Sequence, residues 1–255
     1  MKLDIIYNKD SRSMEEVMDN SIQLIVTSPP YNVNKEYDDH ADAMPNDEYF
    51  KLLHDVWKEC IRVLSDGGRI CVNVANVGRK PYLPLHSTII KQLTDLGLIM
   101  RGEIIWDKEA SVGVSTAWGS WQSPSNPTLR DTHEYILVFS KGSYKLPNHR
   151  NSKSDLTSKE FTEYTKSIWR FPTESAKKVD HPAPFPEELP YRCIKLYTFP
   201  GDVVLDPFNG VGTTCLVAKK LNRKYIGYDI SKNYCKQAEL RIKKYFSQTK
   251  LKQVI

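Results

Sequence analysis

The sequence lacks several features that would assign it to common classes of protein. No apolar run approaches the roughly 18 residues needed to span a membrane, and the first residues, MKLDIIYNKD, contain no signal-peptide hydrophobic region. The five cysteines are scattered without a CxxC pair, which argues against a zinc site and a disulfide framework. There is no GK[ST] phosphate-binding loop and no internal repeat. We therefore expect a cytoplasmic, reduced protein that binds no metal.

Composition places the chain among ordinary globular proteins. It has 255 residues, of which 40% are hydrophobic and 26% are charged, and its net charge is +5. Between residues 141 and 170 there are seven basic residues and only three acidic ones. That stretch is either a solvated loop or a surface for a polyanionic partner.

Apolar runs alternate with segments of helical periodicity along the chain. We expect strands at residues 3–7, 21–26, 69–76, 98–106, 133–140, 203–205 and 225–229, and helices at 47–64, 85–97, 212–221 and 231–246, with another helix beginning near Pro186. This alternation predicts a doubly wound, mostly parallel α/β sheet with helices on both faces. We expect a single domain, 1–255, with an insert at about 109–170.

The segment DPFNGVGTT, residues 206–214, has the features of a ligand-binding turn. In doubly wound sheets, ligands lie beyond the carboxyl ends of strands, at glycine-rich turns that open a helix. Gly210 and Gly212 let the backbone approach a ligand, and the helix start that follows favours an anion. Asp229 ends the next expected strand, where an acid commonly binds the hydroxyls of a ribose.

The segment TSPPYN, residues 27–32, follows the apolar run at 22–26. Its prolines fix the backbone in an extended form. Because proline has no backbone N–H, the segment presents free carbonyl oxygens. Such a rigid segment is suited to holding a hydroxyl, carbonyls and an aromatic ring beside a ligand.

Together, TSPPYN and DPFNGVGTT resemble the S-adenosylmethionine-dependent amino-methyltransferases of DNA. In that family a DPFxGxGT-like turn binds the cofactor, and an [S/D/N]PPY segment holds the target amino group. Because the catalytic segment precedes the cofactor turn, the chain resembles the circularly permuted β group. The resemblance covers nearly the whole chain and implies a seven-stranded methyltransferase sheet, S-adenosyl-L-methionine as cofactor and double-stranded DNA as partner.

The resemblance also assigns roles to residues. The catalytic residues would be Ser28, Pro29, Pro30 and Tyr31, with Ser28 and the Pro29 carbonyl accepting the amino hydrogens and Tyr31 stacking on a flipped base. The cofactor-binding residues would be Asp10, which would contact adenine, Asp206, Phe208, Gly210, Gly212, Thr213, Thr214 and Asp229. The insert would carry sequence recognition, and its candidate DNA-binding residues are Lys141, Lys145, Arg150 and Lys153. Trp106, Trp118, Trp121 and Trp169 lie in or beside it; packing is the first expectation for any one of them.

The residue before PPY bears on the substrate. In the family, SPPY usually accompanies cytosine N4, DPPY usually adenine N6, and NPPY both adenine and protein glutamine. We therefore predict methylation of cytosine N4, with adenine N6 as the main alternative. An RNA or glutamine methyltransferase and a catalytically inactive DNA-binding module are further alternatives. No cysteine follows a proline, which argues against cytosine C5 methylation. The resemblance also admits a cognate restriction endonuclease as a partner.

Overall fold

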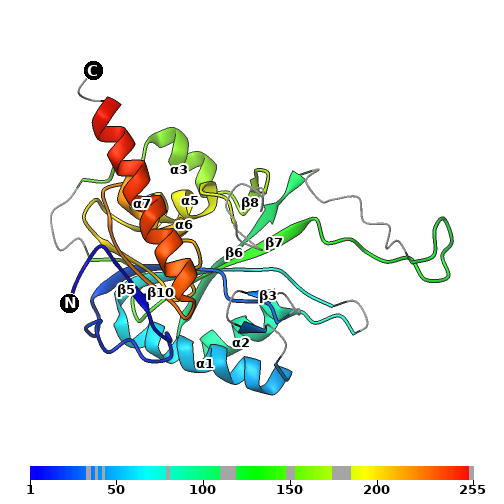
Figure 1. The fold of residues 1–255 in the computed structure, drawn as a ribbon. Helices are drawn as coiled ribbons and strands as arrows, with labels where there is room; N and C mark the ends of the chain where they lie inside the picture. The colour runs from blue at the N-terminus through cyan, green and yellow to red at the C-terminus, as the bar shows by residue number, and fades with distance from the viewer. Residues whose placement is uncertain are drawn as a thin grey trace.

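The computed structural model describes residues 1–32, 36–37, 40–41, 44–78, 81–109, 119–147, 153–173 and 185–252. In these residues one sheet has the strand order β1-β10-β9-β2-β5-β7-β6-β8 (Figure 1). Its strands are β1 (Ile5–Asn8), β2 (Ile22–Thr27), β5 (Leu64–Val74), β6 (Ile99–Asp107), β7 (His133–Ser140), β8 (Ile168–Arg170), β9 (Val203–Asp206) and β10 (Lys224–Asp229). A separate pair consists of β3 (Glu36–Tyr37) and β4 (His40–Ala41). The helices are α1 (Asn46–Val63), α2 (Leu85–Asp95), α3 (Ser158–Tyr164), α5 (Glu188–Tyr197), α6 (Thr213–Lys220) and α7 (Lys232–Lys252).

The direction of the strands creates one edge at which most of them end. β1, β10, β9, β2 and β5 are parallel neighbours, so their carboxyl ends meet at the same edge of the sheet. β7 is antiparallel to β5 and β6, so it begins where those two strands end. We call this side of the sheet the carboxyl edge.

Helices cover both faces of the sheet (Figure 1). On one face, α1 and α2 bury apolar side chains such as Leu53, Trp57 and Ile89 against alternate residues of the strands. On the other, α5, α6 and α7 bury residues such as Leu189 and Leu216. A central strand that is covered on both faces has a nearly continuous apolar sequence, and residues 22–26 are an example. Within the described residues, no helix is both long and apolar enough to cross a membrane.

The structure confirms the predicted α/β class and differs from the prediction in detail. The described sheet has eight strands instead of seven, because residues 168–170 pair with β6 as β8. β7 and β8 both lie within 109–170, so this range contributes two strands to the sheet, and its assignment as a recognition insert stays a prediction. The strand predicted at 69–76 begins earlier, at Leu64, because α1 ends at Val63 and β5 runs through Gly67 and Gly68. At Gly67, with φ of 70°, an added Cβ would lie 1.9 Å from the Lys145 carbonyl oxygen.

Candidate active site

The two sequence motifs lie side by side at the carboxyl edge. TSPPYN follows β2 and DPFNGVGTT follows β9, and these strands are neighbours, with Ile25 opposite Leu205. The Thr27 hydroxyl donates to Asp206 Oδ1 at 2.7 Å, and the Phe208 amide donates to the same oxygen at 3.1 Å. The Asp206 side chain therefore ties the end of β2 to the turn after β9.

Burial makes the carboxyl group of Asp206 a weaker acid than a free aspartate. The residue is 1% exposed, and its burial raises the pKa to about 6, although hydrogen bonds from Thr27, Thr214 and Phe208 lower it. Its contacts support a role in shaping the cofactor turn from beneath. Direct contact of Asp206 with the cofactor remains a prediction.

The turn at 206–214 is built around Asp229 and a glycine. The Asp229 carboxylate accepts the Gly210 amide at 2.7 Å and the Ser231 amide at 2.9 Å, and burial raises its pKa. Gly212 has a φ of 77°, and a Cβ there would lie 2.7 Å from Ala238 Cβ. Only glycine fits this position, which lets the backbone of the turn pack against Ala238 of α7.

Phe208, Thr213 and Thr214, the other predicted cofactor residues of this turn, are held by contacts with the rest of the protein. Thr213 and Thr214 begin α6 and are buried, with the Thr213 hydroxyl accepting from Arg241 at 2.9 Å. The ring of Phe208 packs edge-on against Trp57, with centroids 6.3 Å apart. These contacts fix the turn from within the protein.

Asp10 also lies at the carboxyl edge, beyond β1. β1 and β10 are paired with Asn8 opposite Asp229, and Asn8 Nδ2 donates to the Asp229 and Ile230 carbonyls. Asp10 comes two residues later and forms an ion pair with Arg12 at 2.6 Å. Burial raises the pKa of Asp10, but the hydrogen bonds from Arg12 outweigh burial and the net shift is downward. The strands thus place Asp10 and Asp229, two of the three predicted cofactor carboxylates, at neighbouring strand ends.

On the other side of β2, polar side chains from four segments meet at TSPPYN. We call Ser28, Tyr31, Asn73, Lys108 and Glu134 the catalytic-edge network. Ser28 Oγ lies 3.1 Å from the Tyr31 hydroxyl, which lies 3.3 Å from Glu134 Oε2. Asn73 Nδ2 donates to Glu134 Oε2 at 2.7 Å, and Lys108 Nζ pairs with Glu134 Oε1 at 2.9 Å. Burial, followed by the charge of Glu134, raises the pKa of the Tyr31 phenol, so this group stays protonated.

The two prolines present their carbonyls differently. The Pro30 carbonyl accepts a hydrogen bond from the Tyr49 hydroxyl at 2.6 Å. Among the described residues, no donor bonds to the Pro29 carbonyl. Pro29 is buried and Ser28 is half-buried, and contact of the Pro29 oxygen with a ligand stays a prediction.

The sequence analysis did not single out Asn73, Lys108 or Glu134. Each is polar and stands at the end of an apolar strand that meets the carboxyl edge: Asn73 in β5, Lys108 directly after β6 and Glu134 at the start of β7. This position in the sequence could have marked them as site candidates, because a polar residue there lies at the same edge as TSPPYN. The strand order needed to bring them together was not available from the sequence.

The basic residues predicted to bind DNA lie elsewhere. Lys141 follows β7 at the opposite edge of the sheet, and its ammonium group donates to Asn20 Oδ1 and to the carbonyls of Ile61 and Leu64. Lys145 and Lys153 are exposed, and Arg150 lies outside the described residues, as does Trp118. The position of Lys141 supports a structural role at the start of β5; its contact with DNA remains untested.

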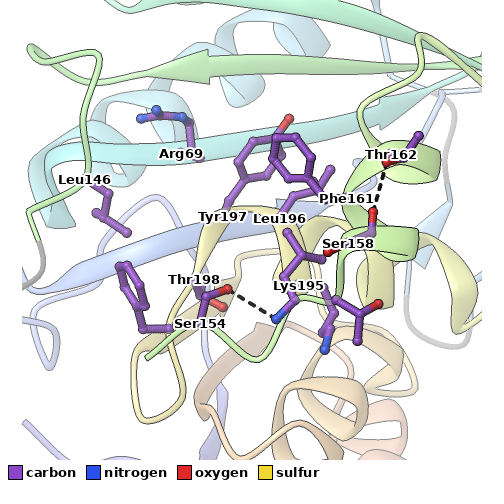
Figure 2. A pocket seen from close by; sticks show the side chains of 13 residues that line it. Arg69, Leu146, Ser154, Ser158, Phe161, Thr162, Lys195, Leu196, Tyr197 and Thr198 are labelled. Atoms are coloured by element: carbon purple, nitrogen blue, oxygen red, sulfur yellow. Dashed lines mark hydrogen bonds between the residues drawn. The ribbon is translucent and has the colours of Figure 1, made fainter. Parts of the chain in front are cut away.

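A cavity of about 570 Å³ lies between α3, the end of α5 and β5, away from both motifs (Figure 2). It is lined in part by Arg69, Phe161, Lys195 and Tyr197. Lys195 forms ion pairs with Asp155 and Glu160, which neutralise its charge. No predicted site residue lines this cavity, so we do not assign the active site to it.

A glycine-rich turn with an acid at the next strand end, next to a rigid SPPY segment, defines a methyltransferase that uses a nucleoside cofactor. Comparison with known families matches residues 22–240 to the N6/N4 family described as DNA methylase. The chain belongs to this DNA methylase family.

Individual relatives agree with that assignment. The chain is 34% identical to the type II methyltransferase M.MjaI of Methanocaldococcus jannaschii, over 91% of this chain and 90% of that protein. It is 28% identical to the DNA adenine methyltransferase YhdJ of Escherichia coli, over 93% of this chain and 82% of YhdJ. Among solved structures, the DNA modification methylase TTHA0409 from Thermus thermophilus, complexed with S-adenosyl-L-methionine, has a TM-score of 0.74 at 28% identity, covering 93% of this chain and 92% of that one. PvuII DNA methyltransferase, named as cytosine-N4-specific, shares the fold with a TM-score of 0.72 at 21% identity, covering 92% of this chain and 85% of that one.

The cofactor of this family, S-adenosyl-L-methionine, agrees with the prediction and fits the residues present. The turn runs through two glycines with positive φ, Gly210 and Gly212, and the Asp229 carboxylate lies beside the Gly210 amide, so backbone without side chains stands next to an acid. When bound, S-adenosyl-L-methionine supplies an electrophilic methyl group. Asp229 and Asp10 are the residues expected to hold its nucleoside.

Proposed function

We propose that this protein is a site-specific DNA methyltransferase that modifies the exocyclic N4 of a flipped-out cytosine. The observation that carries the proposal is the junction between the two motifs. The Thr27–Asp206 hydrogen bond of 2.7 Å places Ser28, the next residue, at the side of the cofactor turn. A target amino group at Ser28 is thereby brought next to the bound cofactor.

The protein's task is to make a poor nucleophile react. The lone pair of an exocyclic amino group is conjugated into the base, and it becomes nucleophilic as the nitrogen turns tetrahedral. Ser28 Oγ and the Pro29 carbonyl would accept the two N–H groups and favour that geometry as positive charge develops. Because Pro29 and Pro30 are rigid and Tyr49 holds the Pro30 carbonyl, these acceptors need little reorganisation.

Tyr31 would supply the platform for the base. Its hydroxyl lies in the catalytic-edge network, while the residue as a whole remains half-buried. An aromatic face held by its hydroxyl is suited to stacking against a base that has left the duplex. The amino group of a paired base is out of reach, which is why we infer base flipping.

The choice of cytosine over adenine depends on Ser28. A serine at this position usually accompanies cytosine N4 in the family, and the fold is shared with a cytosine-N4-specific enzyme. Adenine N6 is the second candidate, because a relative over most of the chain is named as an adenine methyltransferase.

The segment between β6 and β7 is the best-placed element to meet the duplex. Beyond residues 108–109 its described part is 119–132, which projects from the carboxyl edge (Figure 1). Trp121 is 65% exposed and Leu129 is 85% exposed, and apolar side chains of this kind insert between base steps in other DNA-binding proteins. We propose that this arm contacts DNA beside the flipped base. A cognate nuclease and a cytoplasmic location accord with the proposed activity.

The test is modification-detecting sequencing of DNA from a methylation-free bacterial host that expresses the protein. We expect modified cytosines within one short sequence, and none in a host that expresses Ser28→Ala at equal level. Modified adenines would replace the proposed base by the second candidate. Unmodified DNA, with purified protein that binds S-adenosyl-L-methionine, would contradict the proposed activity.

A further inference from the structure

The catalytic-edge network contains a carboxylate that contacts the catalytic segment without belonging to it. Glu134 lies 103 residues after Tyr31 in the chain, yet its Oε2 is 3.3 Å from the Tyr31 hydroxyl. Its side chain is 15% exposed, and that of its partner Lys108 is 17% exposed. A charge pair this well buried is costly to keep unless it does something specific.

Counting hydrogen atoms fixes the direction of each hydrogen bond in this network. Glu134 is paired with the Lys108 ammonium at 2.9 Å, and an ionised carboxylate can only accept. The single proton of the Tyr31 hydroxyl must therefore point to Glu134. Since that proton is used, the Ser28–Tyr31 contact of 3.1 Å requires the Ser28 hydroxyl to donate to Tyr31.

The contacts of the Asn73 amide fit these hydrogen-bond directions. Its amide nitrogen is 2.7 Å from Glu134 Oε2, 3.3 Å from the Tyr31 oxygen and 3.5 Å from Ser28 Oγ. All three neighbours are acceptors if the protons run from Ser28 to Tyr31 to Glu134. Rotating the Asn73 amide would instead bring its carbonyl oxygen against the carboxylate.

We propose that Glu134 is a positioning residue that makes Ser28 an obligatory hydrogen-bond acceptor and thereby selects an amino group over a carbonyl at the target position. The proposal rests on the proposed function, in which Ser28 faces the target group. With its proton directed at Tyr31, Ser28 presents only lone pairs to the ligand. An amino N–H of cytosine or adenine satisfies them, whereas the carbonyl oxygen of uracil or hypoxanthine faces them acceptor to acceptor.

Substituting Glu134 by glutamine should reverse the direction in which Ser28, Tyr31 and residue 134 donate their hydrogen bonds. The Lys108 ammonium would attract the amide oxygen of the glutamine, so the amide nitrogen would face Tyr31 and donate to it, and the Asn73 amide would turn its oxygen toward the same nitrogen. The Tyr31 proton would then turn to Ser28, and the Ser28 proton would turn toward the ligand. Tyr31→Phe interrupts the same chain by removing one oxygen atom, and it keeps the aromatic ring.

The experiment measures selectivity as well as activity. Duplexes containing the site identified by sequencing carry either the amino base or its keto analogue at the target position: cytosine and uracil, or adenine and hypoxanthine. Dissociation constants are measured for both with S-adenosylhomocysteine present, and the keto-to-amino ratio is compared between proteins. Because the ratio is compared on the same DNA pair, any easier opening of a mispaired base cancels.

We expect Glu134→Gln and Tyr31→Phe each to lower the ratio of the keto-duplex dissociation constant to the amino-duplex dissociation constant at least tenfold. Each variant should also lower kcat at least tenfold and keep its affinity for S-adenosylhomocysteine. Asp107→Asn is the matched control, because it makes the same charge change at the same edge, where Asp107 pairs with Arg170 outside the network. It should keep the wild-type ratio.

A role limited to supporting the fold would weaken both duplexes equally and leave the ratio unchanged. That result in Glu134→Gln, or in Tyr31→Phe if the first variant does not fold, would overturn the proposal. Failure of the wild-type protein to methylate either amino base would instead contradict the proposed function, and the two failures are therefore distinguishable.

Discussion

Asp206→Asn is the perturbation whose effect on stability follows most directly from the structure. Asp206 is 1% exposed, and burial raises its pKa from 3.8 to about 6. A carboxyl group with a raised folded-state pKa binds its proton more tightly in the folded protein than in the unfolded chain. Its contribution to stability is therefore present below about pH 4 and is lost as pH rises through about 6.

The size of this stability loss follows from the difference between the pKa of Asp206 in the folded and unfolded states. About two pH units at roughly 1.4 kcal/mol each correspond to a loss of about 3 kcal/mol. About half of this loss is expected between pH 5 and pH 8. An asparagine at this position does not titrate, and its side-chain oxygen can still accept from Thr27 and Phe208. The variant should therefore have a flatter stability profile than the wild type, whatever its absolute stability.

The assay is urea unfolding followed by circular dichroism at several pH values between 5 and 8. The wild-type free energy of unfolding should fall by roughly 1–2 kcal/mol relative to Asp206→Asn across this range. Asp229 also has a pKa raised by burial, so the variant removes only part of the slope. The partly exposed carboxylate of Asp55, whose pKa the hydrogen bond from Lys51 lowers, provides the control variant Asp55→Asn. Parallel profiles for wild type and Asp206→Asn would refute the reasoning.

Three further predictions concern the cofactor turn and the opposite edge of the sheet. Asp229→Ala should weaken S-adenosyl-L-methionine binding at least tenfold in titration calorimetry, because a charged acceptor contributes roughly 1.5–3 kcal/mol per hydrogen bond; unchanged affinity would mean that the nucleoside lies elsewhere. Gly212→Ala should lower both the melting temperature and cofactor affinity, because φ of 77° and the contact with Ala238 leave no room for a Cβ; a variant with wild-type values would contradict the assigned turn geometry. Lys141→Ala should destabilise the fold by about 1–3 kcal/mol by leaving carbonyls unpaired, without changing the salt dependence of DNA binding. A reduced salt slope would instead support the original prediction that Lys141 contacts phosphate.

Much of the architecture was predictable because periodicity and turn residues are local signals. The strand at 133–140 has the predicted limits, and the helix predicted at 47–64 is found at Asn46–Val63. The resemblance predicted that TSPPYN and DPFNGVGTT serve one reaction, and the structure shows that the strands before them, β2 and β9, are neighbours. These features depend on short stretches of sequence and on the rules of the doubly wound fold.

The catalytic-edge network was not predictable, because it depends on strand order and direction. Glu134 reaches Tyr31 only because β7 runs antiparallel and begins where β5 ends. The same reversal carries Lys141 to the far edge, where it bonds to carbonyls near the end of α1. In the sequence, Lys141 looked like one of several equivalent basic residues of a polar stretch.

The most direct test of the central claim is mass spectrometry of nucleosides from DNA that the purified protein has methylated with S-adenosyl-L-methionine. The site built on Ser28, Pro29 and Tyr31 predicts 4-methylcytosine, lost in Ser28→Ala and Tyr31→Ala, whose cofactor affinity should remain. Finding 6-methyladenine would keep the amino-methyltransferase site and change its base. Finding 5-methylcytosine, or full activity in Tyr31→Ala, would contradict the assignment of the carboxyl edge as an amino-methylation site.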